Sequence, residues 1–168
     1  MSRQKPIDAK LLAELLKDSH RSDRELARTL GVSQPTVTRK RTDIEKRAID
    51  GYTVIPKWEE FGFEIVAINF VKHHVKVAKA EDREQAYSRV KEWMMKKPNV
   101  ILAMEGQGMG WDGVFVSFHK NYSDFTEFIK EHNSVFSDLL LDTQSFISSI
   151  SPATTRKPFH LKYLAPLL

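Results

Sequence analysis

The chain has 168 residues, no cysteine, a formal net charge of +4 and a hydrophobic content of 41%. This length suits one large domain or two small ones. The lack of cysteine excludes disulfides, thiolate metal sites and a cysteine nucleophile. Because no apolar run approaches the roughly 18 residues of a membrane span and the first residues lack a signal-peptide pattern, we expect a cytoplasmic protein without a membrane partner.

Positive charge is concentrated in the first third of the chain. Residues 1–57 hold 13 lysines and arginines against 8 acidic residues, a net of +5, whereas the remaining residues hold 13 against 14, a net of −1. Such an asymmetry indicates an anionic partner for residues 1–57. Ordinary variation in surface charge is the alternative that charge alone leaves open.

Two helices are predicted before residue 31. Apolar residues recur at helical spacing from Ile7 to Leu16, and we expect Asp8 to be the N-cap of this first helix. Ser22 and Glu25 have the spacing of a capping box, which predicts a second helix. Gly31 is expected to end that helix, because glycine adopts a positive φ at little cost.

A third helix is predicted to begin only two residues later. Ser33 is a suitable N-cap with Pro35 in the first turn, and Val37, Ile44 and Ala48 mark one apolar face up to about residue 50. Two helices joined by so short a turn must cross steeply, as in a helix-turn-helix. We expect Ala27 to be small because the third helix packs over it. An ordinary three-helix bundle is the alternative.

The outward face of the third helix is polar, which suits DNA recognition. Gln and Arg can form paired hydrogen bonds with purine edges, and a Thr methyl can contact thymine. Residues at the start of a recognition helix approach the bases, whereas others meet phosphates. The residues expected at base edges are Gln34, Thr36 and Arg39, and those expected at the DNA backbone are Ser33, Lys40, Arg41, Arg21 and Arg24.

The remaining residues alternate between strand and helix patterns. Strands are expected at 51–55, 64–71, 100–105, 113–118 and within 139–150, and helices at 84–96 and 122–132. After the linking strand at 51–55, the order is βαββαβ, the ferredoxin-like arrangement. Because helices cover only one face of such a sheet, the other face needs a partner or a ligand, which favours a dimer through sheet packing.

The sequence resembles the Lrp/AsnC (leucine-responsive regulatory protein) family of transcription regulators. The resemblance is carried by residues 7–56, by Gly62 and by the glycine-rich segment that ends in Trp111 and Asp112. It implies an α+β fold: a winged helix-turn-helix at 1–57, a ferredoxin-like RAM domain at 58–151 and a tail at 152–168. Arg41, where the family usually has an apolar residue, and Ala48, where it usually has glycine, depart from the pattern.

The resemblance also implies partners. It implies a homodimer, with tetramers or octamers as further possibilities, that places two recognition helices in successive major grooves of double-stranded DNA, about 10 bp or a multiple apart. It further implies an amino-acid or small-metabolite effector near the segment Gly106, Gly108, Gly110, Trp111 and Asp112. Glycines let backbone N–H groups approach a carboxylate, and Asp112 is suited to an ammonium group. The alternative is a tight connection that Asp112 caps.

No cofactor, metal or catalytic set is predicted, and the chain is interpreted as a non-enzyme. His73 and His74 are adjacent, so their side chains point to opposite faces of a strand. The tail combines basic and apolar residues, and we expect it to pack on its own domain or at a dimer contact. Sirohaem decarboxylases share the two-domain plan, but residues 100–118 lack the expected His, Tyr and Arg set. A metabolite-sensing module without DNA binding is the other alternative.

Overall fold

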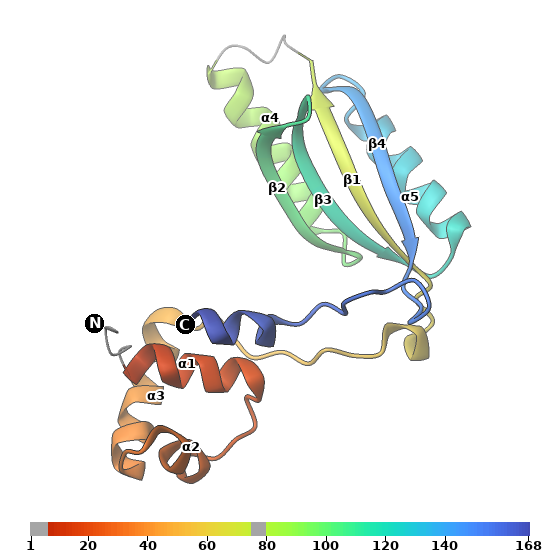
Figure 1. Ribbon diagram of the computed structural model, residues 1–168. Coiled ribbons are helices and arrows are strands. Elements are labelled where there is room, and N and C mark those ends of the chain that lie inside the picture. The colour runs from red at the N-terminus through yellow and green to blue at the C-terminus, as the bar shows by residue number, and fades with distance from the viewer. Residues whose placement is uncertain (1–6, 75–79) are drawn as a thin grey trace. The chain divides into compact units, whose positions relative to one another are not determined.

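The computed structural model of the protein describes residues 7–74 and 80–168. The chain divides into two compact units, one formed by residues 1–56 with 157–168 and the other by residues 57–156. No helix among the described residues is long and apolar enough to cross a membrane. Figure 1 shows the elements of both units.

The first unit contains three α-helices, α1 (Ile7–Lys17), α2 (Asp23–Leu30) and α3 (Gln34–Ala48). The capping box at the start of α2 is confirmed: the Glu25 N–H donates to Ser22 Oγ at 3.3 Å, and the Ser22 N–H donates to the Glu25 carboxylate at 2.8 Å. Ser33 caps α3 by accepting the Thr36 N–H, and Pro35 lies in the first turn.

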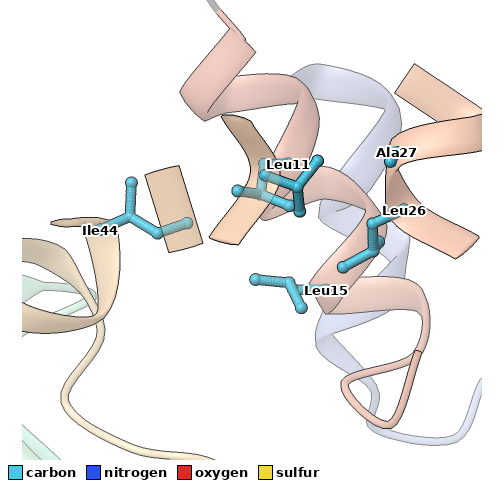
Figure 2. Close-up of a cluster of buried hydrophobic side chains, with 6 residues drawn as sticks. Leu11, Leu15, Leu26, Ala27 and Ile44 are labelled. Atoms are coloured by element: carbon cyan, nitrogen blue, oxygen red, sulfur yellow. The ribbon is translucent and has the colours of Figure 1, made fainter. Parts of the chain in front are cut away.

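One cluster of buried side chains joins these three helices (Figure 2). Its members are Leu11, Leu15, Leu26, Ala27, Val37 and Ile44, with Leu30, Val32 and Ile49 packed against them. Ala48, expected on the apolar face of α3, is exposed because α3 ends there, and Ile49 contacts the cluster instead.

The prediction of a linking strand at 51–55 is wrong. These residues have no strand assignment, and Tyr52, Val54 and Ile55 are exposed. A strand requires a hydrogen-bonded neighbour, and none of the described residues pairs with this segment. The described residues 7–56 therefore contain helices but no strand that would form a wing.

The C-terminal residues belong to the first unit. A 3-10 helix, η2 (Leu161–Leu167), packs against α1, and its Ala165 is buried. The tail therefore covers a helix of the N-terminal unit. The sequence suggested packing on the domain that the tail follows, or a dimer contact, and did not predict this location.

The second unit is the ferredoxin-like sheet that the sequence predicts. After a short 3-10 helix, η1 (Trp58–Phe61), come β1 (Ile65–His73), α4 (Ala80–Met95), β2 (Val100–Gly108), β3 (Trp111–His119), α5 (Tyr122–Val135) and β4 (Leu140–Ser149). The sheet order is β2-β3-β1-β4, and every neighbouring pair is antiparallel. Residues 75–79, which the sequence left unassigned within 72–82, lie outside the described residues.

Helices α4 and α5 lie on one face of the sheet (Figure 1). Alternate residues of β1 and β3 are buried on this side, where Val71 and Phe115 pack against Phe128 of α5. The residues between them, such as Ile68 and its neighbour Phe146 on β4, point to the other face and are exposed. The sheet thus has one covered face and one open apolar face.

Candidate nucleic-acid interface

The turn between α2 and α3 fixes the geometry of the helix-turn-helix. Gly31 has φ of +69°, in the left-handed region, and its N–H donates to the Ala27 carbonyl. Only residues 31–33 separate the two helices. Buried Ala27, together with buried Val37 of α3, allows the helices to approach closely. The predicted role of Gly31 is thereby confirmed, and Ala27 is buried in the same cluster as Val37.

The first two turns of α3 expose the residues that the sequence places at base edges. Gln34 and Arg39 are exposed and Thr36 is half-buried. Within the described part of the chain, the side chains of Gln34 and Arg39 have no hydrogen-bond or ion-pair partner. A free amide and a free guanidinium at the start of one helix are the groups that direct recognition of purines requires.

Ser33 and Arg24 flank this surface. The Ser33 hydroxyl is occupied by the cap and lies 2.8 Å from the Thr36 hydroxyl. Arg24 is exposed on α2, and its side chain likewise has no partner among residues 7–74 and 80–168. Arg24 is therefore available to an external anion, whereas the Ser33 side chain mainly stabilises the start of α3.

Two other expected phosphate contacts are held in ion pairs. Lys40 Nζ lies 2.9 Å from Asp8 Oδ1, and Arg21 pairs with Glu14 and donates to the Thr29 hydroxyl.

The prediction of Asp8 as an N-cap is wrong because α1 already begins at Ile7, so Asp8 lies in the first turn. The hydrogen bond from Lys40 lowers the pKa of Asp8, outweighing the effect of burial.

Arg41 differs most from its expected role as a phosphate contact. Its guanidinium donates to Glu45, Asp23 and the carbonyl oxygens of Ser19 and Arg21. Burial disfavours the charged form, but the hydrogen bonds to Glu45 and Asp23 outweigh this effect and raise the pKa of Arg41. In this structure the side chain is directed into the unit. The sequence did not predict Asp23 as a partner of Arg41. The Glu45 partner is recognisable from the sequence, because a spacing of four residues on a helix is typical of an ion pair.

The expected effector loop is a tight hairpin. Strand β2 continues to Gly108, which pairs with Trp111, so only Met109 and Gly110 form the turn, with φ of +51° and +83°. Two successive residues with positive φ are typical of a two-residue hairpin turn. The structure therefore shows the tight connection that the sequence left open as an alternative, and β2 continues beyond its predicted end at residue 105.

Asp112 and Trp111 have partners within the second unit. The Asp112 carboxylate accepts the His73 N–H at 2.9 Å, and the Trp111 ring lies 6.1 Å from that of Phe70. A cavity of about 430 Å³ lies on the helix side of the sheet, lined by residues that include Glu105, Gly113 and Lys91 but none from 106–112. The structure thus brings the five expected effector residues together at one hairpin and places none of them in this cavity.

The histidines of the described residues are candidates for a metal or catalytic site. The described residues contain no group of three or more metal-ligating side chains. His119 lies in the core, where its Nε2 is 2.9 Å from Ser117 Oγ and its Nδ1 is 3.8 Å from Asp124 Oδ2. Because the side chains of His119 and Ser117 are completely buried, a substrate cannot reach them in this structure.

Comparisons with known proteins agree with this architecture. The family model of the AsnC-type helix-turn-helix domain matches residues 6–41. An HTH-type transcriptional regulator of Pyrococcus abyssi is 27% identical over 125 residues, 74% of this chain and 78% of the relative. A regulator of Pyrococcus furiosus is 28% identical over 130 residues, 77% of this chain and 81% of the relative.

Solved structures share the fold of the whole chain. The transcriptional regulator NMB0573 of Neisseria meningitidis, solved as an L-Met complex, has a TM-score of 0.75 at 20% identity and covers 99% of this chain and 100% of its own. AsnC of E. coli has a TM-score of 0.69 at 15% identity and covers 93% and 98%.

A helix-turn-helix unit followed by a ferredoxin-like unit defines the class: the protein is a DNA-binding transcriptional regulator. Within that class, residues 6–41 match the AsnC-type helix-turn-helix domain, and the fold of the whole chain is similar to that of AsnC.

Proposed function

We propose that the protein reads DNA with the start of α3, using Gln34, Thr36 and Arg39 at base edges in the major groove. The observation that carries the proposal is that Gln34 and Arg39 are exposed, free of intramolecular partners within the described residues, and presented by a helix whose start is fixed by Gly31 and Ser33. A bidentate contact from such a residue contributes about 1–3 kcal/mol of discrimination between bases.

Contacts to phosphate position the protein without specifying sequence. Arg24 is exposed and has no side-chain partner among the described residues, and Ser33 offers its backbone N–H at the helix start. Lys40 and Arg21 reach phosphates by exchanging Asp8 and Glu14 for the DNA backbone. Arg41 is omitted from this set because four of its five N–H donors are already used within the unit.

We further propose a homodimer that forms through the open face of the sheet, with higher oligomers built from it. Exposed apolar side chains gather on that face, including Ile68, Leu102, Met104 and Phe146. An exposed apolar patch of this kind indicates an interaction surface. A dimer offers two α3 helices to one duplex, which calls for half-sites about 10 bp, or a multiple, apart.

An amino acid or another small metabolite is the proposed effector, bound at the β2–β3 hairpin by Gly106, Gly108, Gly110, Trp111 and Asp112. The L-Met complex of the similar regulator from Neisseria supports this class of ligand. The test is calorimetric titration with L-methionine and other amino acids. We expect Asp112→Asn to abolish binding and Glu105→Gln, at the rim of the cavity, to leave it unchanged; the reverse pattern would place the ligand in the cavity.

Selection of genomic fragments, followed by gel-shift titration at physiological salt, tests the proposed DNA function. We expect a subset of fragments to bind with higher affinity than bulk DNA, and Gln34→Ala with Arg39→Ala to remove that preference. Equally weak binding to every fragment would contradict sequence-specific recognition. Intact regulation in cells by the double variant would favour a sensing module, and conversion of an iron tetrapyrrole would favour the enzymatic alternative.

A further inference from the structure

Arg41 lies on α3, but its hydrogen bonds lead away from the outer face of the helix. Nη1 donates to the Arg21 carbonyl and to Asp23 Oδ1, both at 3.2 Å, and Nη2 donates to the Ser19 carbonyl at 3.3 Å. Ser19 and Arg21 lie between α1 and α2, and Asp23 is the first residue of α2. One side chain therefore joins α3 to the two elements that precede it.

The same contacts extend along α3 and to the segment that follows it. Arg41 Nε donates to Glu45 Oε1 at 2.9 Å, and the Tyr52 hydroxyl donates to the same oxygen at 2.7 Å. The Arg41 guanidinium lies 5.8 Å from the centre of the Tyr52 ring, and the Thr38 hydroxyl donates to Asp23 Oδ2 at 2.7 Å. Asp23, Thr38, Arg41, Glu45 and Tyr52 are called the Arg41 network below.

The Arg41 network is partly withdrawn from water. The side chains of Arg41 and Asp23 each retain 22% of their exposure. Four of the five N–H donors of the guanidinium are used by the hydrogen bonds to Glu45, Asp23 and the two carbonyls. A planar guanidinium suits this arrangement, whereas a lysine ammonium cannot reproduce its directions.

We propose that Arg41 is a positioning residue that fixes the orientation of α3 relative to α2, and that it does not contact the DNA backbone. The proposal rests on the proposed reading of DNA by α3. Base-edge hydrogen bonds require accurate placement of Gln34 and Arg39, whereas long side chains reach phosphates over a range of helix orientations. Loss of the Arg41 network therefore lowers the preference for the operator more than it lowers binding to other DNA.

The experiment measures affinity for a selected operator fragment and for an unrelated duplex between about 50 and 200 mM salt. We expect Arg41→Met to weaken operator binding about tenfold while binding to the unrelated duplex, and the slope of log affinity against log salt, stay unchanged. A phosphate contact would instead reduce the slope by about one for each copy bound and weaken both duplexes alike; that result would overturn the proposal.

Two further variants keep the test decisive if Arg41→Met folds poorly. Arg41→Lys keeps the positive charge but loses the planar hydrogen bonds, so we expect it to resemble Arg41→Met; restoration of wild-type operator preference by lysine contradicts the proposal. Tyr52→Phe removes one hydroxyl from an exposed ring, and we expect about a threefold loss of operator preference with an unchanged salt slope.

Arg47→Met is the matched control. Arg47 lies on the same helix and pairs with Asp43 and Asp8, and among the described residues it has no hydrogen bond or ion pair with the Arg41 network. We expect its operator preference to remain at the wild-type value; a loss equal to that of Arg41→Met would contradict a specific role for Arg41. If Gln34→Ala and Arg39→Met also leave operator preference intact, the proposed reading by α3 fails, and not the inference about Arg41 alone.

Discussion

At the scale of single residues, the short turn between α2 and α3 depends on backbone conformation more than on side-chain contacts. A Cβ added to Gly31 would meet no atom within 4 Å, but its φ of +69° lies where L-residues are strained. The sequence could predict this position because glycine follows the last apolar residue of α2. It could not predict the partners of Arg41 between α1 and α2, because Ser19 and Arg21 contribute carbonyl oxygens that no residue type reveals.

Gly31→Ala tests this reading of the turn. We expect a loss of about 1–2 kcal/mol in the free energy of unfolding, the cost of placing an L-residue in the left-handed region, and a smaller loss for Gly31→Asn. Urea denaturation measures it. Gly51→Ala is the control, because Gly51 also has open space but no positive φ; equal losses at both positions would contradict the explanation.

At the scale of elements, the starts of α2 and α3 and the four strands of the sheet were predictable because caps and apolar runs are local in sequence. Ser22 and Ser33 predict the starts of α2 and α3, and the run of β-branched residues around Ile68 predicts β1. The segment 51–55 shows the limit, because β-branched residues favour a strand only where a neighbour supplies hydrogen bonds. The sequence predicts strands that end at residue 105 and begin again at residue 113, whereas the pairing of Gly108 with Trp111 extends both strands toward the turn.

The packing of α5 on the sheet predicts an acid-sensitive fold. Burial lowers the pKa of His119, with partial opposition from Asp124, and burial also lowers the pKa of His132, with opposition from Asn133. Protons therefore bind these groups more weakly in the folded state. The stability contributed by the neutral rings is present above the ordinary histidine pKa of about 6.5 and is lost as pH falls through the lowered pKa values.

Urea denaturation at a series of pH values between about 7.5 and 5 measures this effect. We expect the midpoint to fall with pH, and His119→Gln to reduce the dependence while lowering stability at neutral pH. His20→Gln on the surface should leave the dependence unchanged. A midpoint that is constant or rises as pH falls would contradict the assignment.

At the scale of the whole molecule, the two units and their element order were predictable, whereas the location of the tail was not. Residues 157–168 follow the second unit in sequence but pack with α1 in the first. The basic and apolar residues of the tail indicate an amphipathic segment, but they do not identify the surface that this segment covers. The open face of the sheet is the opposite case, since the fold itself requires one uncovered face.

Phe146→Asp tests the dimer proposed through that face. Phe146 is 63% exposed on the open side of β4, and a buried unpaired carboxylate at an apolar interface is strongly unfavourable. We expect the dissociation constant of the dimer to rise by at least about tenfold, a change of about 1.4 kcal/mol, in sedimentation equilibrium. Tyr122→Asp, at a side chain that is 62% exposed on α5, should not change it; equal effects of the two variants would contradict the proposed surface.

The central claim is that the start of α3 enters the major groove, and photo-crosslinking measures this most directly. A photoreactive residue placed at Gln34 is compared with one at Lys10, which is exposed on α1, each bound to a selected operator fragment. We predict crosslinks from position 34 to bases, at sites repeated about 10 bp or a multiple apart, and none to bases from position 10. Base crosslinks from position 10 with none from position 34 would contradict the account.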